Sequence, residues 1–267
     1  MDASVASLPQ SRLRSTVRVA ALVAFSLVMF LPVLALWALT LERTRAFVVR
    51  FFYIVCGKIV GIRIHQQGIV SKQRPLMLVA NHSSYLDIFI LGSFLPLSFT
   101  PKREIRSWPV IGFFCVLADC VFIERRPADM QRAQGEMQEK LAMGKVLALF
   151  PEGTTGDGFH VKPFKSGFLS LVEEHHLPLQ PVSLAYTHIG HVPLSAATRE
   201  QVAWIGEASF VTHFMRLLKF PYIQVTAQFH DVQLMAEEED RKMLAKTCEE
   251  IITTGLHHLL EANGVTG

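Results

Sequence analysis

Two short blocks of polar residues carry the side chains best suited to chemistry. The first block is Asn-His-Ser-Ser-Tyr-Leu-Asp at residues 81–87, in which Asp87 follows His82 by five positions. A histidine supplies a base near neutral pH, and an adjacent carboxylate fixes its tautomer and stabilises its protonated form. Of the 11 histidines, only His82 has an aspartate at that spacing. His82 and Asp87 are therefore the candidate catalytic pair.

The same block also has a structural interpretation. Ser84 and Asp87 have the spacing of a capping box, with Ser84 as the N-cap of a helix. Residues five apart do not share a face of a continuous helix, so a His82–Asp87 contact requires a tight strand-to-helix turn. Both interpretations predict that a helix begins inside this block.

The second block is Phe-Pro-Glu-Gly-Thr at residues 150–154. Gly153 permits a backbone conformation that exposes N–H groups, and such groups bind anions or a developing oxyanion. Glu152 adds an acid to the same turn. The alternative is an ordinary turn, because proline and glycine favour turns for purely conformational reasons.

The elements around these blocks predict how they are positioned. Apolar runs at 76–80 and 146–150 directly precede the two blocks and are typical of buried strands. Polar residues at the ends of neighbouring strands of an α/β sheet face one crevice. Further strands are expected at 121–123, 179–185, 202–205 and 223–230, and helices at 128–143, 165–175 and 237–261. This alternation predicts an α/β fold, with a mixed sheet covered by helices.

The N-terminal part of the chain is predicted to be embedded in a membrane. Residues 19–41 contain no charged side chain, and as a helix they would extend roughly 35 Å, enough to cross a bilayer core. Pro32 would kink this helix or turn it back within one leaflet. The apolar stretch 46–64 contains three basic residues, which suits a helix in the headgroup region, although a core helix of the globular part is the alternative. The expected division is a polar tail (1–18), a membrane segment with an interfacial helix (19–64) and a globular domain (65–267).

Charge and cysteine content exclude some classes of function. The net charge of +3 is too small to indicate a nucleic-acid partner. The four cysteines have neither C-x-x-C spacing nor a metal-site pattern, so no metal is expected and the thiols suit a reducing compartment. The globular domain is therefore expected on the cytosolic side of the inner membrane.

Four blocks, in order along the chain, resemble the 1-acylglycerol-3-phosphate acyltransferase family. This group of lysophospholipid acyltransferases includes the bacterial lyso-ornithine lipid acyltransferases. The matching blocks are residues 81–87, 121–125, 150–154 and 177–182, and the resemblance covers roughly residues 70 to 190. It implies that the domain 65–267 is a membrane-bound glycerolipid acyltransferase domain, which transfers a fatty acyl group to the free hydroxyl of a lysolipid.

The resemblance also implies a role for each residue of the site. His82 would remove the proton of the acceptor hydroxyl, and Asp87 would orient its imidazole. The hydroxyl would then attack the thioester of acyl carrier protein or coenzyme A directly, with no cofactor and with backbone N–H groups near Gly153 supporting the oxyanion. The residues assigned to substrate binding are Glu152, Gly153, Thr154, Arg125 and Lys102.

Two departures from the family pattern bear on the acceptor. Where many members that make phosphatidic acid have an arginine, this chain has Thr155, and a hydroxyl does not replace a bidentate guanidinium. Asp119 stands where the second block normally begins with glycine. The acceptor thus stays open between 1-acylglycerol-3-phosphate, which would give phosphatidic acid, and lyso-ornithine lipid, whose zwitterionic headgroup suits residues 152–158 better.

Two other classes of function fit the sequence less well than an acyltransferase. A lipid or thioester hydrolase would need an activated serine, and the chain has no Gly-x-Ser-x-Gly elbow. A non-catalytic membrane adaptor would explain the apolar N-terminus but not the four ordered blocks.

Overall fold

A mixed β-sheet forms the centre of the protein. The computed structural model describes residues 8–108, 111–123, 127–206 and 208–265. The strand order is β1-β7-β5-β2-β4-β3, with β6 paired to β5. The strands are β1 (Ile62–Gln67), β2 (Leu76–Ala80), β3 (Ser98–Phe99), β4 (Val146–Leu149), β5 (Leu179–Ile189), β6 (Val192–Pro193) and β7 (Ile223–Phe229).

The direction of the strands decides which loops meet. Strands β3, β4, β2 and β5 run parallel, whereas β7 is antiparallel to β5. Leu78 lies level with Ala148 of β4 and Gln180 of β5, so the carboxyl ends of β2 and β4 lie at one edge of the sheet. The segments that follow these strands contain the two polar blocks. The predicted α/β fold with a mixed sheet is confirmed.

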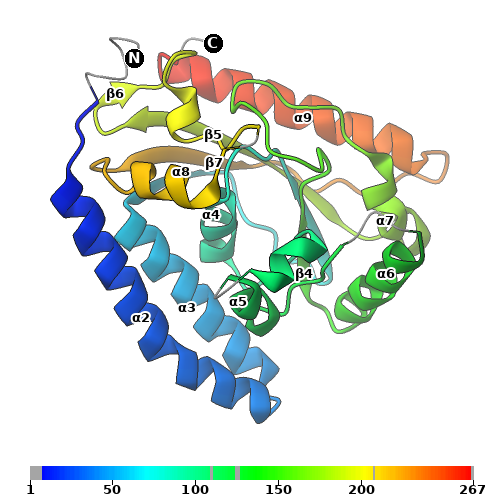
Figure 1. Ribbon diagram of the computed structural model, residues 1–267. Helices are drawn as coiled ribbons and strands as arrows, with labels where there is room; N and C mark the ends of the chain where they lie inside the picture. The colour runs from blue at the N-terminus through cyan, green and yellow to red at the C-terminus, as the bar shows by residue number, and fades with distance from the viewer. Residues whose placement is uncertain (1–7, 109–110, 124–126, 207, 266–267) are drawn as a thin grey trace.

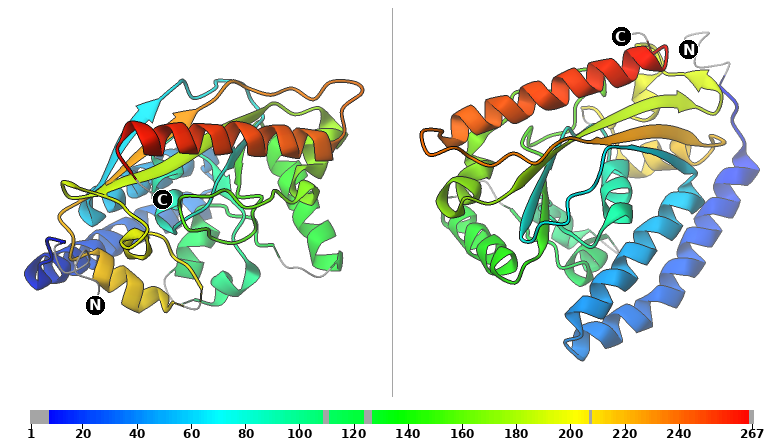
Figure 2. Two further views of the ribbon diagram at one scale, coloured as in Figure 1. Left: turned by 90° about the horizontal axis from the view of Figure 1, so that it is seen from above. Right: turned by 180° about the vertical axis from the view of Figure 1, so that it is seen from behind.

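Helices cover both faces of the sheet. Helix α4 (Leu86–Phe94) and α3 (Glu42–Val60) lie on one side, and α9 (Arg241–Ala262) runs along the other (Figure 2). Leu76, Leu78 and Ala80 of β2 belong to the core on the α4 side, while Met77 and Val79 belong to the core beneath α9. This alternation explains why β2 is apolar throughout. The remaining helices are α5 (Ile111–Leu117), α6 (Pro127–Ala142), α7 (Ser170–His175), α8 (Phe210–Leu217), η1 (Arg103–Ser107), η2 (Ser166–Leu169) and η3 (Arg199–Gln201).

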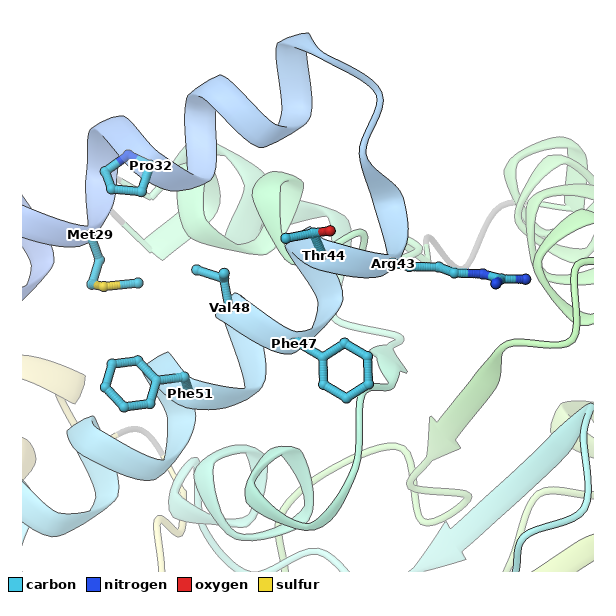
Figure 3. A pocket seen from close by; sticks show the side chains of 7 residues that line it. All are labelled: Met29, Pro32, Arg43, Thr44, Phe47, Val48 and Phe51. Atoms are coloured by element: carbon cyan, nitrogen blue, oxygen red, sulfur yellow. The ribbon is translucent and has the colours of Figure 1, made fainter.

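The N-terminal part forms a helical hairpin beside the domain (Figure 1). Helix α2 (Arg12–Ala38) begins inside the predicted polar tail, where the Ser11 side chain accepts a hydrogen bond from the Arg14 N–H. Among the described helices, α2 alone is long and apolar enough to cross a membrane. A groove of about 520 Å³ lies between α2 and α3, where Met29 faces Val48 and Phe51 (Figure 3).

Both ends of the hairpin are bonded to the globular domain. At its base, the Arg18 guanidinium donates to the carbonyls of Phe220 (2.6 Å) and Pro221 (2.7 Å). At its tip, Glu42 pairs with Lys145 at 2.7 Å. The hairpin therefore lies along the domain instead of projecting away from it.

Helix α3 ends earlier than the sequence predicted. Gly61 has a φ of 92°, and a Cβ at this position would collide with the Arg18 guanidinium and lie 3.1 Å from the Pro221 carbonyl oxygen. Only glycine fits this left-handed turn against those neighbours. The helix consequently ends at Val60, and the next residues form β1 within the predicted interfacial segment.

Most other predicted elements are confirmed, with three corrections. The strands predicted at 76–80, 146–150, 179–185 and 223–230 correspond to β2, β4, β5 and β7, and the helices at 128–143 and 237–261 to α6 and α9. Residues 202–205 form a loop and not a strand, because the Trp204 N–H donates to the Ser83 carbonyl at 2.9 Å. Residues 121–123 form only a bridge between Ile123 and Lys102, and the helix predicted at 165–175 is divided into η2 and α7.

Candidate active site

Asn81 lies directly after strand β2, at the start of the turn that carries His82. Its side-chain amide donates to the Leu184 carbonyl at 2.9 Å, and its side-chain oxygen accepts from the Leu184 N–H at 2.8 Å. The side chain thus continues the pairing of β2 with β5 one residue beyond Ala80. The main chain is free to turn at His82 while the sheet remains hydrogen-bonded.

His82 and Asp87 meet across this turn, as predicted. The distance between His82 Nδ1 and Asp87 Oδ2 is 2.8 Å, and the Asp87 side chain is fully buried. Asp87 Oδ2 also accepts the backbone N–H groups of Ser83 (2.9 Å) and Ser84 (3.0 Å). The bond from Ser84 is the capping-box contact, although Tyr85 occupies the N-cap position. One carboxylate therefore both begins the helix and orients the histidine.

Tyr186 of β5 holds the other oxygen of Asp87, a contact that the sequence did not predict. Its hydroxyl donates to Asp87 Oδ1 at 2.5 Å, and the tyrosine is buried. Burial and the charge of Asp87 raise the pKa of Tyr186 well above its usual value, so the phenol remains a donor. One sequence signal points to this contact. Alternate residues of a strand share a face, so Tyr186 lies on the same face of β5 as Leu184, which pairs with Asn81.

Phe150, from the second block, holds the imidazole of His82. The two rings stack with their centroids 4.0 Å apart and their planes 16° from parallel. Because Nδ1 is bonded to Asp87, Nε2 is the nitrogen that remains for a substrate proton. The His82 side chain is 19% exposed, which gives a substrate access to it.

Glu152 fastens the second block to the first. Its two carboxylate oxygens accept the backbone N–H groups of His82 (2.7 Å) and Lys162 (3.0 Å). The side chain is buried, and burial raises the pKa of Glu152 to about 7 against the opposing effect of these two hydrogen bonds. Glu152 thus positions the backbone of His82, whereas Asp87 holds its side chain.

The turn at Gly153 differs from its predicted arrangement. Gly153 has a φ of 69°, but its N–H donates to the Phe150 carbonyl at 3.0 Å, so the turn itself uses the group expected to support an oxyanion. A Cβ at this position would lie 2.8 Å from Lys165 Nζ. An ammonium group therefore lies over the turn, beside the exposed Thr154.

Thr155 is bonded to two other segments of the protein. Its hydroxyl donates to the Trp204 carbonyl, and its own carbonyl accepts from Lys162 Nζ at 2.7 Å. The next residue, Gly156, donates its N–H to the His82 carbonyl at 2.7 Å. The loop that carries Thr155 is therefore fixed between the turn at His82 and the loop at Trp204.

The two remaining predicted binding residues are less defined. Lys102 is exposed and follows β3, at the same edge of the sheet as His82 and Glu152. Arg125 lies outside the described residues.

Asp119 stands at the position where the second block normally begins with glycine, and the structure shows why aspartate fits there. It has a φ of 61°, a left-handed conformation that aspartate tolerates better than most residues. Its carboxylate contacts Lys140 at 2.5 Å, Lys145 at 2.9 Å and Arg45 at 3.8 Å. The substitution keeps the turn and ties α6 to the tip of the hairpin.

Comparison with known proteins places this site in a family. The acyltransferase family model matches residues 61–185, which span β1, both polar blocks and most of β5. A lyso-ornithine lipid O-acyltransferase of Brucella abortus is 34% identical over 218 residues, covering 79% of this chain and 82% of that protein. A 1-acyl-sn-glycerol-3-phosphate acyltransferase of Neisseria gonorrhoeae is 30% identical over 178 residues, covering 66% of this chain and 68% of that one. The chain belongs to this acyltransferase family.

A solved structure shares the fold. The crystal structure of the 1-acyl-sn-glycerophosphate (LPA) acyltransferase PlsC from Thermotoga maritima superposes with a TM-score of 0.62 at 21% identity, covering 91% of this chain and 97% of that chain. Because it covers 91% of this chain, the similarity extends well beyond the region 61–185 that the family model matches.

In the described part of the chain, no group of three or more His, Cys, Asp or Glu side chains is arranged to hold a metal ion.

Proposed function

We propose that this enzyme transfers a fatty acyl group from a thioester of acyl carrier protein or coenzyme A to the hydroxyl of lyso-ornithine lipid, yielding ornithine lipid. The observation that carries the chemistry is the hydrogen-bonded pair of His82 and the buried Asp87. A neutral imidazole held through Nδ1 by a carboxylate presents Nε2 as a general base.

The reaction needs no covalent intermediate on the protein. His82 Nε2 takes the proton of the acceptor hydroxyl as its oxygen attacks the thioester carbonyl. Asp87 stabilises the resulting imidazolium, and the proton then passes to the departing thiolate. Lys165 Nζ, beside Gly153, supplies positive charge for the oxyanion or for an acidic headgroup.

The choice of acceptor rests on Thr155. At the place where phosphate-binding relatives have arginine, this side chain is neutral and bonded to the Trp204 carbonyl. A phosphate monoester would lose a bidentate partner there. Lyso-ornithine lipid has a single carboxylate and an ammonium group instead, and the Brucella abortus relative is named for that acceptor.

A hydrolase is the less favoured alternative. Ser83 and Ser84 adjoin His82, but both direct their backbone N–H groups to Asp87, and Ser84 Oγ accepts from the Leu86 N–H at 3.4 Å. Both serines are buried, and in the described part of the chain neither hydroxyl is hydrogen-bonded to the His82 imidazole, whose bonded partner is Asp87.

We also propose that the α2–α3 hairpin is embedded in one leaflet of the inner membrane, with the domain on the cytosolic side. Helix α2 exposes an apolar surface along its length, including Val23, Leu27 and Leu31. Because its base is bonded to Phe220 and Pro221 and the tip residue Glu42 is bonded to Lys145, a full crossing would carry parts of the domain into the bilayer.

One assay tests the acceptor and the donor together. Purified enzyme is given a labelled acyl thioester of either carrier and a panel of lysolipids presented in the same vesicles. We expect lyso-ornithine lipid to show the highest kcat/KM. Equal or faster acylation of 1-acylglycerol-3-phosphate would overturn the proposed acceptor, and release of free fatty acid without any acceptor would favour the hydrolase.

A further inference from the structure

Helix α8 is held rigidly against the active-site turn by its inner face. His213 Nδ1 lies 2.8 Å from the Tyr85 hydroxyl, and the Arg216 guanidinium donates to the Glu200 carbonyl at 2.8 Å. The rings of Phe210 and Phe214 pack on Tyr85, with centroid distances of 4.9 and 5.8 Å. Since Tyr85 belongs to the same turn as His82, the orientation of α8 is fixed relative to the catalytic pair.

The outer face of α8 carries two large apolar side chains and the uncharged Thr212. Val211 and Met215 are one helical turn apart on the same side, and they are 66% and 40% exposed. Arg216, the only Lys, Arg, Asp or Glu residue in the helix, is bonded inward to Glu200. This rigid helix therefore presents two large apolar side chains outward.

Helix α8 adjoins the first turns of α2. The Ser15 hydroxyl donates to the Met215 carbonyl at 3.3 Å, which places the start of α2 against α8 (Figures 1 and 2). Leu13 and Val17 lie on the opposite face of α2 from Ser15 and are 74% and 58% exposed. The exposed apolar surface of α2 therefore begins at the end of the helix that contacts α8.

We propose that Val211 and Met215 form a second contact with the lipid bilayer, separate from the α2–α3 hairpin. The inference goes beyond the proposed reaction and rests only on the proposed attachment of α2 to a membrane. A second contact beside Tyr85 fixes how the domain is tilted and places the entrance to His82 at the lipid surface. A lysolipid can then reach the site without leaving the bilayer.

A fluorescent label reports the contact directly. Val211→Cys is labelled with an environment-sensitive dye and mixed with vesicles of phosphatidylcholine and phosphatidylglycerol, and Met243→Cys is the matched control. Met243 is 57% exposed but lies on α9, across the sheet. We expect vesicles to shift the emission at position 211 to the blue and to leave position 243 unchanged. The same response at both positions would overturn the proposal.

A double variant tests the consequence for turnover. In Val211→Asp with Met215→Asp, we expect vesicle partition to weaken about tenfold or more, because each apolar side chain contributes about that factor when buried. Activity on a lysolipid in vesicles should fall in proportion, whereas activity on a short, water-soluble lysolipid should stay within twofold of wild type. Equal loss on both acceptors would contradict the proposal and would indicate that α8 binds a protein donor such as acyl carrier protein.

Discussion

The Tyr186 hydroxyl and Asp87 Oδ1 are joined by a hydrogen bond of 2.5 Å, on the oxygen that His82 does not contact. Both side chains are buried. Tyr186 on strand β5 thus shares the negative charge of Asp87 with the imidazole and influences the proposed base through this carboxylate.

Replacing Tyr186 by phenylalanine should slow the chemical step and leave substrate binding almost unchanged. Without this donor, Asp87 keeps only its contacts through Oδ2, so the imidazole that it orients is placed less precisely. We expect kcat to fall about tenfold, the scale of one hydrogen bond to a charged group, while KM changes little.

Tyr222→Phe provides the matched control for this comparison. Its hydroxyl bonds to His191 at 3.0 Å, away from His82 and Asp87, so kcat should stay close to that of wild type. A purely structural role for Tyr186 would lower stability but leave the kcat of the folded enzyme unchanged, and this result would refute the positioning role.

Glu152 should make stability depend on pH in a characteristic direction. Burial raises the pKa of Glu152 to about 7, so the folded state keeps a proton that the unfolded state releases above about pH 4.5. Stability should therefore fall as the pH rises between these values, by on the order of 2–3 kcal/mol. Denaturant unfolding of wild type and Glu152→Gln at several pH values measures the difference, since the variant should lack this slope. Identical slopes in the two proteins would count against it.

Asp119→Asn should loosen the tip of the hairpin. The asparagine tolerates the left-handed backbone but no longer pairs with Lys140, Lys145 and Arg45. We expect a loss of roughly 1–2 kcal/mol of unfolding free energy at neutral pH and faster proteolysis near residues 39–41.

The sign of the pH effect at Asp119 is opposite to that at Glu152. Burial opposes ionisation of Asp119, but hydrogen bonds and attraction from Lys140 and Lys145 outweigh it and lower its pKa. The stability that Asp119 contributes is present above its ordinary pKa and is lost as the pH falls through the lowered value. Wild type and Asp119→Asn should therefore converge in acid, and a constant difference at all pH values would show that charge is not the cause.

Thr155→Arg should shift acceptor preference toward 1-acylglycerol-3-phosphate. Arginine offers two parallel donors to a phosphate, on the order of 1.5–3 kcal/mol for a charged hydrogen bond, although the bond from Thr155 to Trp204 is lost. The measurement is the ratio of kcat/KM for 1-acylglycerol-3-phosphate and lyso-ornithine lipid in both proteins. A ratio that stays constant would show that position 155 lies outside the headgroup site.

The sequence predicts the elements whose signals are local. Strands β2 and β4 are continuous apolar runs directly before polar blocks, and His82 and Asp87 are close enough in the chain for one turn to join them. The sequence does not predict strand β1, because its first residues continue the apolar stretch of α3. Only the turn at Gly61 separates the two elements.

Contacts between distant segments were not predictable in this way. Tyr186 and Asp87 are brought together by the pairing of β2 with β5, which no local pattern encodes. Trp204 lies in an apolar run typical of a strand, yet its N–H bonds to Ser83 and its ring packs on Tyr85. Even within one turn, the sequence does not show which acceptor a backbone group takes: Gly153 has the expected conformation, but its N–H donates to the Phe150 carbonyl.

The central claim is that His82 is the general base for acyl transfer, and the turnover of His82→Ala tests it most directly. The exposed His160, which pairs with Asp157 at 2.9 Å, provides the control variant His160→Ala. With labelled acyl thioester and lyso-ornithine lipid in vesicles, His82→Ala should lose several orders of magnitude in kcat while its thermal unfolding and vesicle binding match wild type. His160→Ala should keep most of its activity. Retention of a tenth of the wild-type rate by folded His82→Ala would contradict the assignment.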